Sequence, residues 1–234
     1  MGETRIGIIV PFDFALDREY WQFVPGDVSL HVTRTGFHSG PVGIELAEAV
    51  SEPAEAAEAT RTLVAIEPEA VVYACTSGSF VRGLGGERRL REAILGAGGR
   101  RAATTSGALL DVLRVLGVRR VALGTPYVAA LGERLRSFVG EAGFKAASLA
   151  NLDLEGGIAD LGADDVRRLA KAAFVREADA LFLSCTNLPT VGLLRPLSAE
   201  LGLPVLSANQ VTMWGALTAA GRADAAAGLL DRRA

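Results

Sequence analysis

Short apolar runs alternate with longer amphipathic segments along most of the chain. Runs of aliphatic and β-branched residues that stop at proline or at small polar residues predict strands. Segments in which apolar residues recur every three or four positions predict helices. The predicted strands are 5–11, 28–35, 71–74, 100–105, 120–127, 144–149, 181–184 and 203–207. The predicted helices are 12–23, 44–66, 81–96, 106–117, 128–142, 163–177, 191–201 and 210–220, with the last dozen residues as a frayed tail.

This alternation predicts an α/β fold in which helices flank parallel sheets. Three landmarks recur in the same order at offsets of 104 to 115 residues: a strand ending in proline and an aromatic residue, an apolar strand ending in Cys-Thr, and a strand end leading into a helix. We therefore predict two pseudo-symmetric halves, residues 1–117 and 118–234, around a cleft. The C-terminal helix is predicted to pack across onto the first half.

Composition and charge restrict the class of partner. The chain has 234 residues, half of them hydrophobic, and a net charge of −3, which gives nucleic acid no electrostatic support. No apolar run reaches the ~18–20 residues of a spanning helix, so we expect no membrane association. The N-terminus leads directly into a strand and lacks the layout of a signal peptide. We therefore expect a cytoplasmic protein with reduced thiols.

The two cysteines of the chain, Cys75 and Cys185, each follow an apolar run and precede a threonine. A single cysteine in such a run is usually a small buried hydrophobe. A matched pair at the carboxyl ends of two strands points instead to a ligand site, because ligands of parallel sheets bind there. The small polar residues after each cysteine predict that each sulfur lies at the mouth of a helix, where amide donors lower the thiol pKa and hold a carboxylate. One thiolate could then attack or deprotonate a carbon while the other thiol delivers a proton.

Other site chemistries find little support in the sequence. A metal site is not expected, because there is no Cys-x-x-Cys and the two histidines, His31 and His38, are distant from both cysteines. The chain lacks the Gly-x-Ser-x-Gly elbow of hydrolases and a Gly-x-Gly-x-x-Gly after its first strand. We expect no cofactor. Two lobes around a cleft also describe ligand-binding proteins, which stay as a non-enzymatic alternative.

The two Cys-Thr strand ends, the Val-Pro that ends the first strand and the Thr-Pro-Tyr at 125–127 resemble the aspartate/glutamate racemase superfamily. The maleate cis-trans isomerase and arylmalonate decarboxylase branch is the most similar, because Asn187 stands where glutamate racemases have a histidine. The resemblance implies a cofactor-independent isomerase with Cys75 as nucleophile and Cys185 as acid/base, and a homodimer or higher homo-oligomer. An amino-acid or hydantoin racemase and a decarboxylase stay as alternatives, although decarboxylases have glycine at the first cysteine position.

The expected partner is a small carboxylate substrate. The resemblance implies that hydroxyl and amide groups of Thr76, Ser77, Thr186 and Tyr127 hold it. Further candidates for substrate binding are Pro11, Asp13, Asn187 and Asn209, although the last could instead cap its helix. The sequence departs from maleate isomerases at Phe12-Asp13-Phe14, where they carry Ser-Ser-Asn or similar. An aspartate there would repel a dicarboxylate, which favours a bulkier or less anionic acid.

Overall fold

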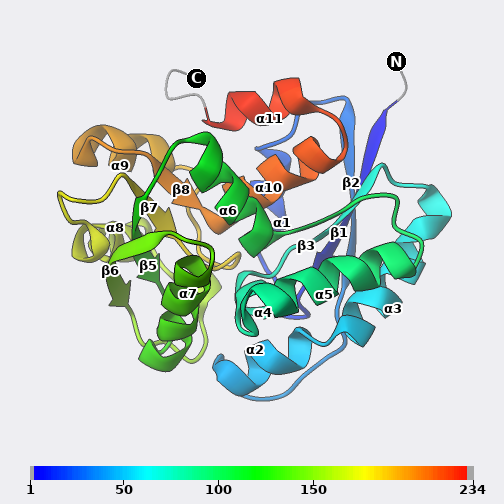
Figure 1. Ribbon diagram of the computed structural model, residues 1–234, viewed down its shortest axis with the longest axis horizontal. Coiled ribbons are helices and arrows are strands. Elements are labelled where there is room, and N and C mark those ends of the chain that lie inside the picture. The colour runs from blue at the N-terminus through cyan, green and yellow to red at the C-terminus, as the bar shows by residue number, and fades with distance from the viewer. Residues whose placement is uncertain (1–2, 231–234) are drawn as a thin grey trace.

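The computed structural model describes residues 3–230 and contains two four-stranded parallel sheets in that range (Figure 1). The first sheet has the order β2-β1-β3-β4 and the second the order β6-β5-β7-β8. The strands are β1 (Thr4–Val10), β2 (Val28–Arg34), β3 (Ala70–Tyr73), β4 (Ala102–Thr104), β5 (Arg120–Thr125), β6 (Lys145–Asn151), β7 (Ala180–Leu183) and β8 (Val205–Ser207). The helices are α1 (Asp17–Trp21), α2 (Ile44–Val50), α3 (Pro53–Leu63), α4 (Thr76–Phe80), α5 (Gly83–Gly96), α6 (Thr105–Val115), α7 (Ala129–Glu141), α8 (Ala163–Ala173), α9 (Leu194–Leu201), α10 (Ala208–Ala219) and α11 (Ala223–Leu230).

The two sheets are built alike down to individual hydrogen bonds. The amide of Glu69 donates to the carbonyl of Arg5 at 2.8 Å, and the amide of Asp179 donates to the carbonyl of Arg120 at 2.8 Å. Both pairs join the start of the cysteine-bearing strand to the start of its neighbour. The prediction of two pseudo-symmetric halves with parallel sheets is therefore confirmed.

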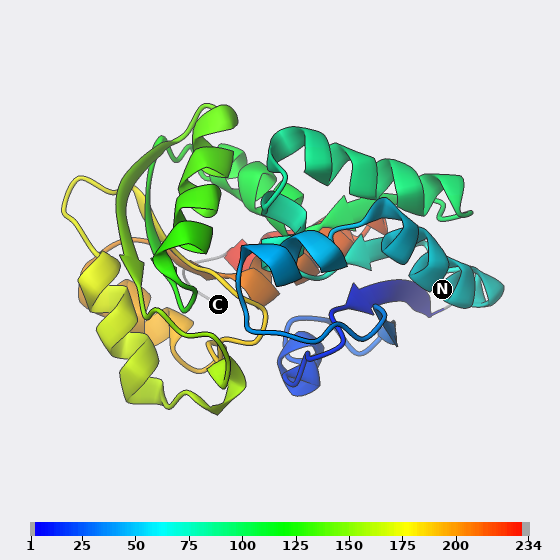
Figure 2. The ribbon, with the colours of Figure 1, turned by 90° about the horizontal axis from the view of Figure 1, so that it is seen from below.

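Helices cover both sheets and bury most of the central strands, as parallel sheets require. On the first sheet, α3 contacts β1, β2 and β3, and α5 contacts β3 and β4. On the second sheet, α8 contacts β5, β6 and β7. Figure 2 shows the two halves side by side. Every residue of β3 and of β7 is buried. No helix in residues 3–230 is long and apolar enough to cross a membrane.

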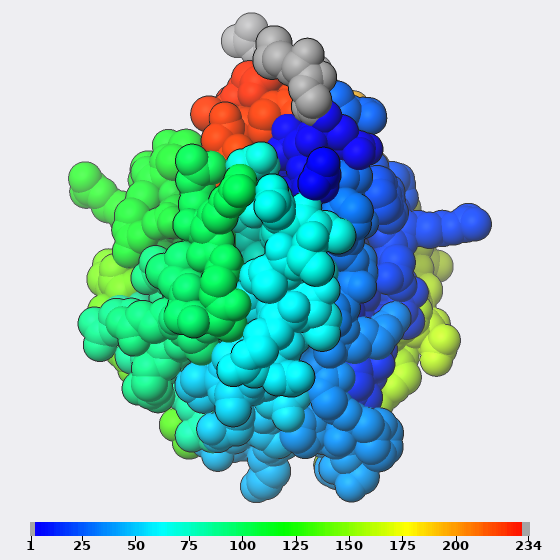
Figure 3. Space-filling view, turned by 90° about the vertical axis from the view of Figure 1, so that its right-hand side faces the viewer, coloured from blue at the N-terminus to red at the C-terminus, as the bar shows by residue number. Residues whose placement is uncertain are grey.

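The last helices return from the second half to the first. Helix α10 packs along α6 and contacts β3 and β4 as well as β8. Arg222, between α10 and α11, donates to Thr4 Oγ1 at 3.2 Å and forms an ion pair with Asp27 at 3.2 Å. In Figure 3 the orange and red C-terminal segment accordingly lies against the dark blue N-terminal residues.

Three predicted elements differ from the structure. The predicted helix 44–66 is divided into α2 and α3 because Pro53 starts a new helix at its first turn. The predicted helix 12–23 is reduced to α1, since Arg34 donates to the carbonyls of Pro11, Phe12 and Phe14 and holds that stretch as a loop. The predicted tail contains α11, whose Ala226 is buried, while 231–234 lie outside the described residues.

Candidate active site

Both cysteines lie at the carboxyl ends of central strands and border the same cavity. Cys75 follows β3 and Cys185 follows β7, and both are free, buried thiols. The cavity measures about 480 Å³ when it is counted out to its open mouth. Its lining residues are Pro11, Phe12, Asp13, Val42, Gly43, Leu46, Ala47, Val50, Cys75, Thr76, Ser77, Tyr127, Ile158, Cys185, Thr186 and Asn187.

Cys75 caps the N-terminus of α4, as the sequence predicts. Its Sγ accepts a hydrogen bond from the amide of Gly78 at 3.4 Å and lies 3.8 Å from Ser77 Oγ. Residue 78 has to be glycine, because a Cβ there would lie 2.5 Å from the Tyr73 hydroxyl and 3.2 Å from the cysteine sulfur. The first thiol is thus fixed between a helix end and a buried tyrosine.

Cys185 has a different backbone conformation, with φ of +94°. Non-glycine residues in this region carry strain of roughly 1–3 kcal/mol and persist only where neighbouring contacts enforce them. The prediction of a helix mouth is wrong here, since the chain forms a turn closed by Leu188 N–H on the Cys185 carbonyl at 3.1 Å. Pro189 explains the difference, because it disfavours helical backbone at the residue before it. The next helix, α9, starts only at Leu194.

The predicted lowering of the thiol pKa values is also wrong. Burial raises the pKa of Cys75 to about 11 and that of Cys185 to about 12. Hydrogen bonds from Gly78 N–H to Cys75, and from the Tyr127 hydroxyl and Asn187 N–H to Cys185, act in the opposite direction but are outweighed. The charge of Asp13 raises both values further. Both sulfurs are therefore protonated in the free protein at neutral pH.

Seven predicted binding residues border the cavity: Pro11, Asp13, Thr76, Ser77, Tyr127, Thr186 and Asn187. The hydroxyl of Thr76 is buried without a hydrogen-bond partner among the described residues. Leaving such a group unpaired costs about 1–3 kcal/mol, which is tolerated where a ligand completes the bonding. Asn209 does not border the cavity but lies behind Thr186, to whose carbonyl it donates at 3.0 Å. It is not the helix cap either, since Ser207 caps α10.

The cavity has a polar side and an apolar side. The thiols, hydroxyls and amides form the polar side, whereas Val42, Leu46, Val50 and Ile158 contribute apolar surface. No lysine, arginine or histidine is among the described residues that line it. The one charged side chain is that of Asp13, at the mouth, which remains accessible to solvent. Partial desolvation of its carboxyl by the surrounding protein raises its pKa. An anionic ligand is thus met by neutral donors alone.

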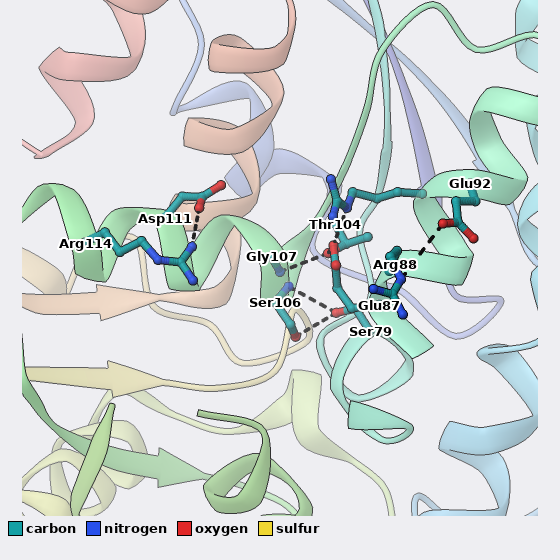
Figure 4. A network of polar contacts seen from close by, with 10 residues as sticks. Ser79, Glu87, Arg88, Glu92, Thr104, Ser106, Gly107, Asp111 and Arg114 are labelled. Carbon is teal, nitrogen blue, oxygen red and sulfur yellow. Dashed lines mark hydrogen bonds and ion pairs between the residues drawn. The ribbon is translucent and has the colours of Figure 1, made fainter. Parts of the chain in front are cut away.

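Sequence reasoning missed several residues that hold the cysteine turns. Ser79 Oγ donates to the carbonyls of Cys75 and Thr76, and Ser106 faces it from α6 (Figure 4). Glu19 and Tyr20 of α1 are buried beside the second turn and the thiols respectively. None of these residues belongs to a motif, and only the packing of α1 and α6 against the turns reveals them.

Comparison with known proteins agrees with this geometry. The family model described as arylmalonate decarboxylase matches residues 45–230. The chain belongs to the arylmalonate decarboxylase family. The maleate isomerase of Nocardia farcinica is 32% identical over 224 residues, which cover 89% of this chain and 86% of that protein. The arylmalonate decarboxylase of Bordetella bronchiseptica is 35% identical over 150 residues, 62% of each protein.

Solved structures of the arylmalonate decarboxylase family have the same fold. A liganded mutant of arylmalonate decarboxylase, with glycine-to-cysteine and cysteine-to-serine substitutions, superposes with a TM-score of 0.86 at 31% identity, over 94% of each chain. A cysteine-to-serine mutant of the N. farcinica maleate cis-trans isomerase, with a covalently bound succinylcysteine intermediate, gives 0.84 at 26% identity, over 92% of each chain. The resemblance noted in the sequence is confirmed, and the relatives identify this protein as an enzyme.

Proposed function

We propose that this protein is a cofactor-independent isomerase that uses Cys75 and Cys185 on a small carboxylic acid. The observation that carries the proposal is that two thiols from different sheets border one cavity. Two such groups can add a nucleophile and transfer a proton at adjacent carbons of one substrate. The succinylcysteine intermediate in the N. farcinica relative supports a covalent step on cysteine.

Neutral donors hold the substrate carboxylate on the polar side of the cavity. The unpaired hydroxyl of Thr76 and the neighbouring Ser77 and Thr186 can donate to its oxygens. Tyr127 stays protonated, and so remains a donor, because burial raises its pKa well above the ordinary value. Donors that are already in position stabilise the charge that develops on the carboxylate during the reaction.

The proposed reaction proceeds through a thioether. Cys75 loses its proton to solvent, and its sulfur bonds to the alkene carbon β to the bound carboxylate. The π electrons move to the α carbon and the carboxylate, and the Cys185 thiol protonates the α carbon. The former double bond is now single and rotates. The Cys185 thiolate then removes a proton from the α carbon, the double bond forms again, and the C–S electrons return to Cys75, which takes up a proton from solvent.

The remainder of the substrate is neutral and apolar. It would lie against Val42, Leu46 and Ile158, with Asp13 at the mouth. A second carboxylate in this position would meet the Asp13 carboxylate and no cation, and such like-charge contacts are unfavourable. A β-substituted unsaturated monocarboxylic acid therefore fits the cavity better than maleate, the substrate named for several relatives.

A racemase is the second candidate, because the same two thiols could exchange a proton at one α carbon. The two functions differ in their products. In deuterated water, proton NMR would follow maleate and a series of cis β-alkyl acrylates for the isomerase, and chiral 2-aryl carboxylic acids and amino acids for the racemase. Conversion of a cis acid to its trans isomer is expected. Deuterium entering an α position with loss of optical activity would instead identify the racemase.

Trapping of the intermediate tests the assigned roles of the cysteines. The Cys185→Ser variant should retain the substrate on Cys75 as an adduct that intact-mass and peptide mass spectrometry detect. The Cys75→Ser variant is the matched control and should carry no adduct. Binding without turnover by the unmodified protein across the acids, with no adduct in either variant, would leave a ligand-binding protein and contradict the isomerase.

A cytoplasmic location and a homo-oligomeric state form part of the same proposal. Both cysteines must remain reduced for the reaction, and reducing compartments preserve such thiols. Light scattering coupled to size-exclusion chromatography would measure the oligomeric state, and cell fractionation would test the location.

A further inference from the structure

We propose that Glu19 and Asn209 are positioning residues that hold the peptide between Thr186 and Asn187, and through it the hydrogen bond to Cys185. This inference rests on the proposed function only in assigning Cys185 a role in catalysis. The relay, which runs from Glu19 through Asn209 to the peptide between Thr186 and Asn187, is defined by hydrogen bonds within the protein. It connects a carboxylate of the first half to the reactive turn of the second.

Glu19 is a buried carboxylate whose described hydrogen bonds all come from the second half. It is 6% exposed, and it lies on α1. Its Oε1 accepts from the amides of Thr190 at 2.7 Å and Val191 at 3.1 Å. Its Oε2 accepts from Asn209 Nδ2 at 2.8 Å and from Thr190 Oγ1 at 3.3 Å. Hydrogen bonds to a charged acceptor are about twice as strong as neutral ones, so this carboxylate fixes both the turn and Asn209.

Asn209 passes this constraint to the peptide that follows Cys185. The same Nδ2 that donates to Glu19 also donates to the carbonyl of Thr186 at 3.0 Å. In a trans peptide the carbonyl and the next N–H point in opposite directions. Fixing the Thr186 carbonyl therefore also directs the Asn187 N–H, and this N–H is hydrogen-bonded to the Cys185 sulfur.

The backbone of Cys185 requires such external support. Its φ of +94° is unfavourable for a residue with a side chain, and no helix follows to hold the turn. Without the Asn209 contact the peptide after Cys185 could rotate and relieve this strain. The hydrogen bond to the sulfur would then be lost.

The first half holds its own cysteine turn at the equivalent position. Ser106 Oγ donates to the carbonyl of Thr76, the residue after Cys75, at 3.1 Å. Ser106 lies two residues after the helix cap Thr104, as Asn209 lies two residues after the cap Ser207. Each half therefore has a side chain near the start of the helix after its last strand that binds the peptide following its cysteine. Only the second of these contacts is supported by a buried carboxylate from the opposite half.

Selective alkylation of the two thiols tests the relay without requiring a substrate. Wild type, Asn209→Ala, Glu19→Gln and Ser106→Ala would be treated with iodoacetamide at pH 9, and peptide mass spectrometry would give the rate at each cysteine. Loss of one hydrogen bond to a thiolate should slow its alkylation by about tenfold or more. We expect Asn209→Ala and Glu19→Gln to slow the alkylation of Cys185 by about that factor. The alkylation rate of Cys75 should change less than about twofold. Ser106→Ala should slow the alkylation of Cys75 and leave that of Cys185 unchanged.

The outcomes separate positioning from general stability. A change of equal size at both thiols, no change, or a faster reaction at Cys185 would overturn the relay. Asn209→Ser keeps a donor, as Ser106 does in the first half, and replaces Asn209→Ala if that variant does not fold by circular dichroism. If the isomerase is confirmed, both relay variants should lower kcat more than they change KM and accumulate the Cys75 adduct. If no acid is converted, the alkylation rates still show whether Glu19 and Asn209 position the turn at Cys185.

Discussion

The side-chain amide of Asn187 donates a hydrogen bond to the backbone carbonyl of Asp13 at 3.1 Å. Its Oδ1 in turn accepts from the amide of Ala15 at 2.9 Å. The turn after β7 is thereby joined to the loop after β1, and the two halves meet at the mouth of the cavity. The position of Asp13 relative to the thiols depends on this contact.

Asn187→Ala should raise KM by about tenfold, because two hydrogen bonds that hold the loop 11–16 are lost and each contributes about 0.5–1.5 kcal/mol. The kcat value should change less, since both thiols keep their own contacts. Steady-state kinetics on the best substrate measures both parameters. Asn187→Asp keeps the acceptor for Ala15, so its KM should lie between that of the wild type and that of Asn187→Ala. A loss confined to kcat would contradict this interpretation.

The sequence was sufficient for the fold and for most residues of the cavity. Strand ends are marked by Pro11 and by the Cys-Thr pairs, and parallel strands bring their carboxyl ends to one edge. The repeated order of landmarks then placed the two cysteines on a shared cleft. These inferences succeed because hydrophobic periodicity and turn residues act locally along the chain.

Features that depend on the packing of distant segments could not be predicted. Burial outweighs the amide donors at both thiols, and the depth of burial follows from neighbours such as Tyr20 and Tyr127. The turn after Cys185 is held by side chains of α1 and α10, which are distant from it in the sequence. Glu19 looks like a surface residue in the sequence, and only the fold surrounds its carboxylate with donors.

Asp13→Asn should shift substrate preference toward dicarboxylates. Removing the carboxylate at the mouth removes a repulsion, and we expect the ratio of kcat/KM for maleate to that for a monocarboxylic acid to rise about tenfold. Both thiols should also react faster with iodoacetamide, because the charge of Asp13 raises their pKa values. Asp17→Asn is the matched control, as it changes net charge equally on α1 outside the cavity lining. An unchanged preference ratio would exclude Asp13 as a determinant of specificity.

Alkylation of Cys75 should accelerate steadily with pH. A thiol with a pKa of about 11 is protonated at neutral pH. The reactive thiolate then increases about tenfold for each pH unit until the pKa is approached. Iodoacetamide labelling between pH 7 and pH 10, read at the Cys75 peptide, would measure the slope. A plateau below pH 9 would show that the thiolate is stabilised in the free protein.

The same shift makes folding stability depend on pH. The pKa of Cys75 rises from 9.0 to about 11 on folding, so the folded state keeps its proton longer. The resulting stability is complete below pH 9 and is lost as pH rises toward 11, by on the order of 2 kcal/mol for this group. Urea unfolding at pH 8 and pH 10.5 would measure the loss. The loss of stability should be smaller in Cys75→Ala. An equal loss in the wild type and in this variant would show that other groups cause it.

Gly78→Ala should disable the enzyme while most of the fold survives. The added methyl group would lie 2.5 Å from the Tyr73 hydroxyl, which is fully buried and bonded to the Val50 carbonyl and therefore cannot retreat. The Cys75 turn must move instead, and a displacement of this kind costs about 100-fold in kcat. Overpacking should lower the free energy of unfolding by about 1–3 kcal/mol. Gly96→Ala, at the open end of α5, should leave activity unchanged, and full activity of Gly78→Ala would show that the sulfur tolerates another position.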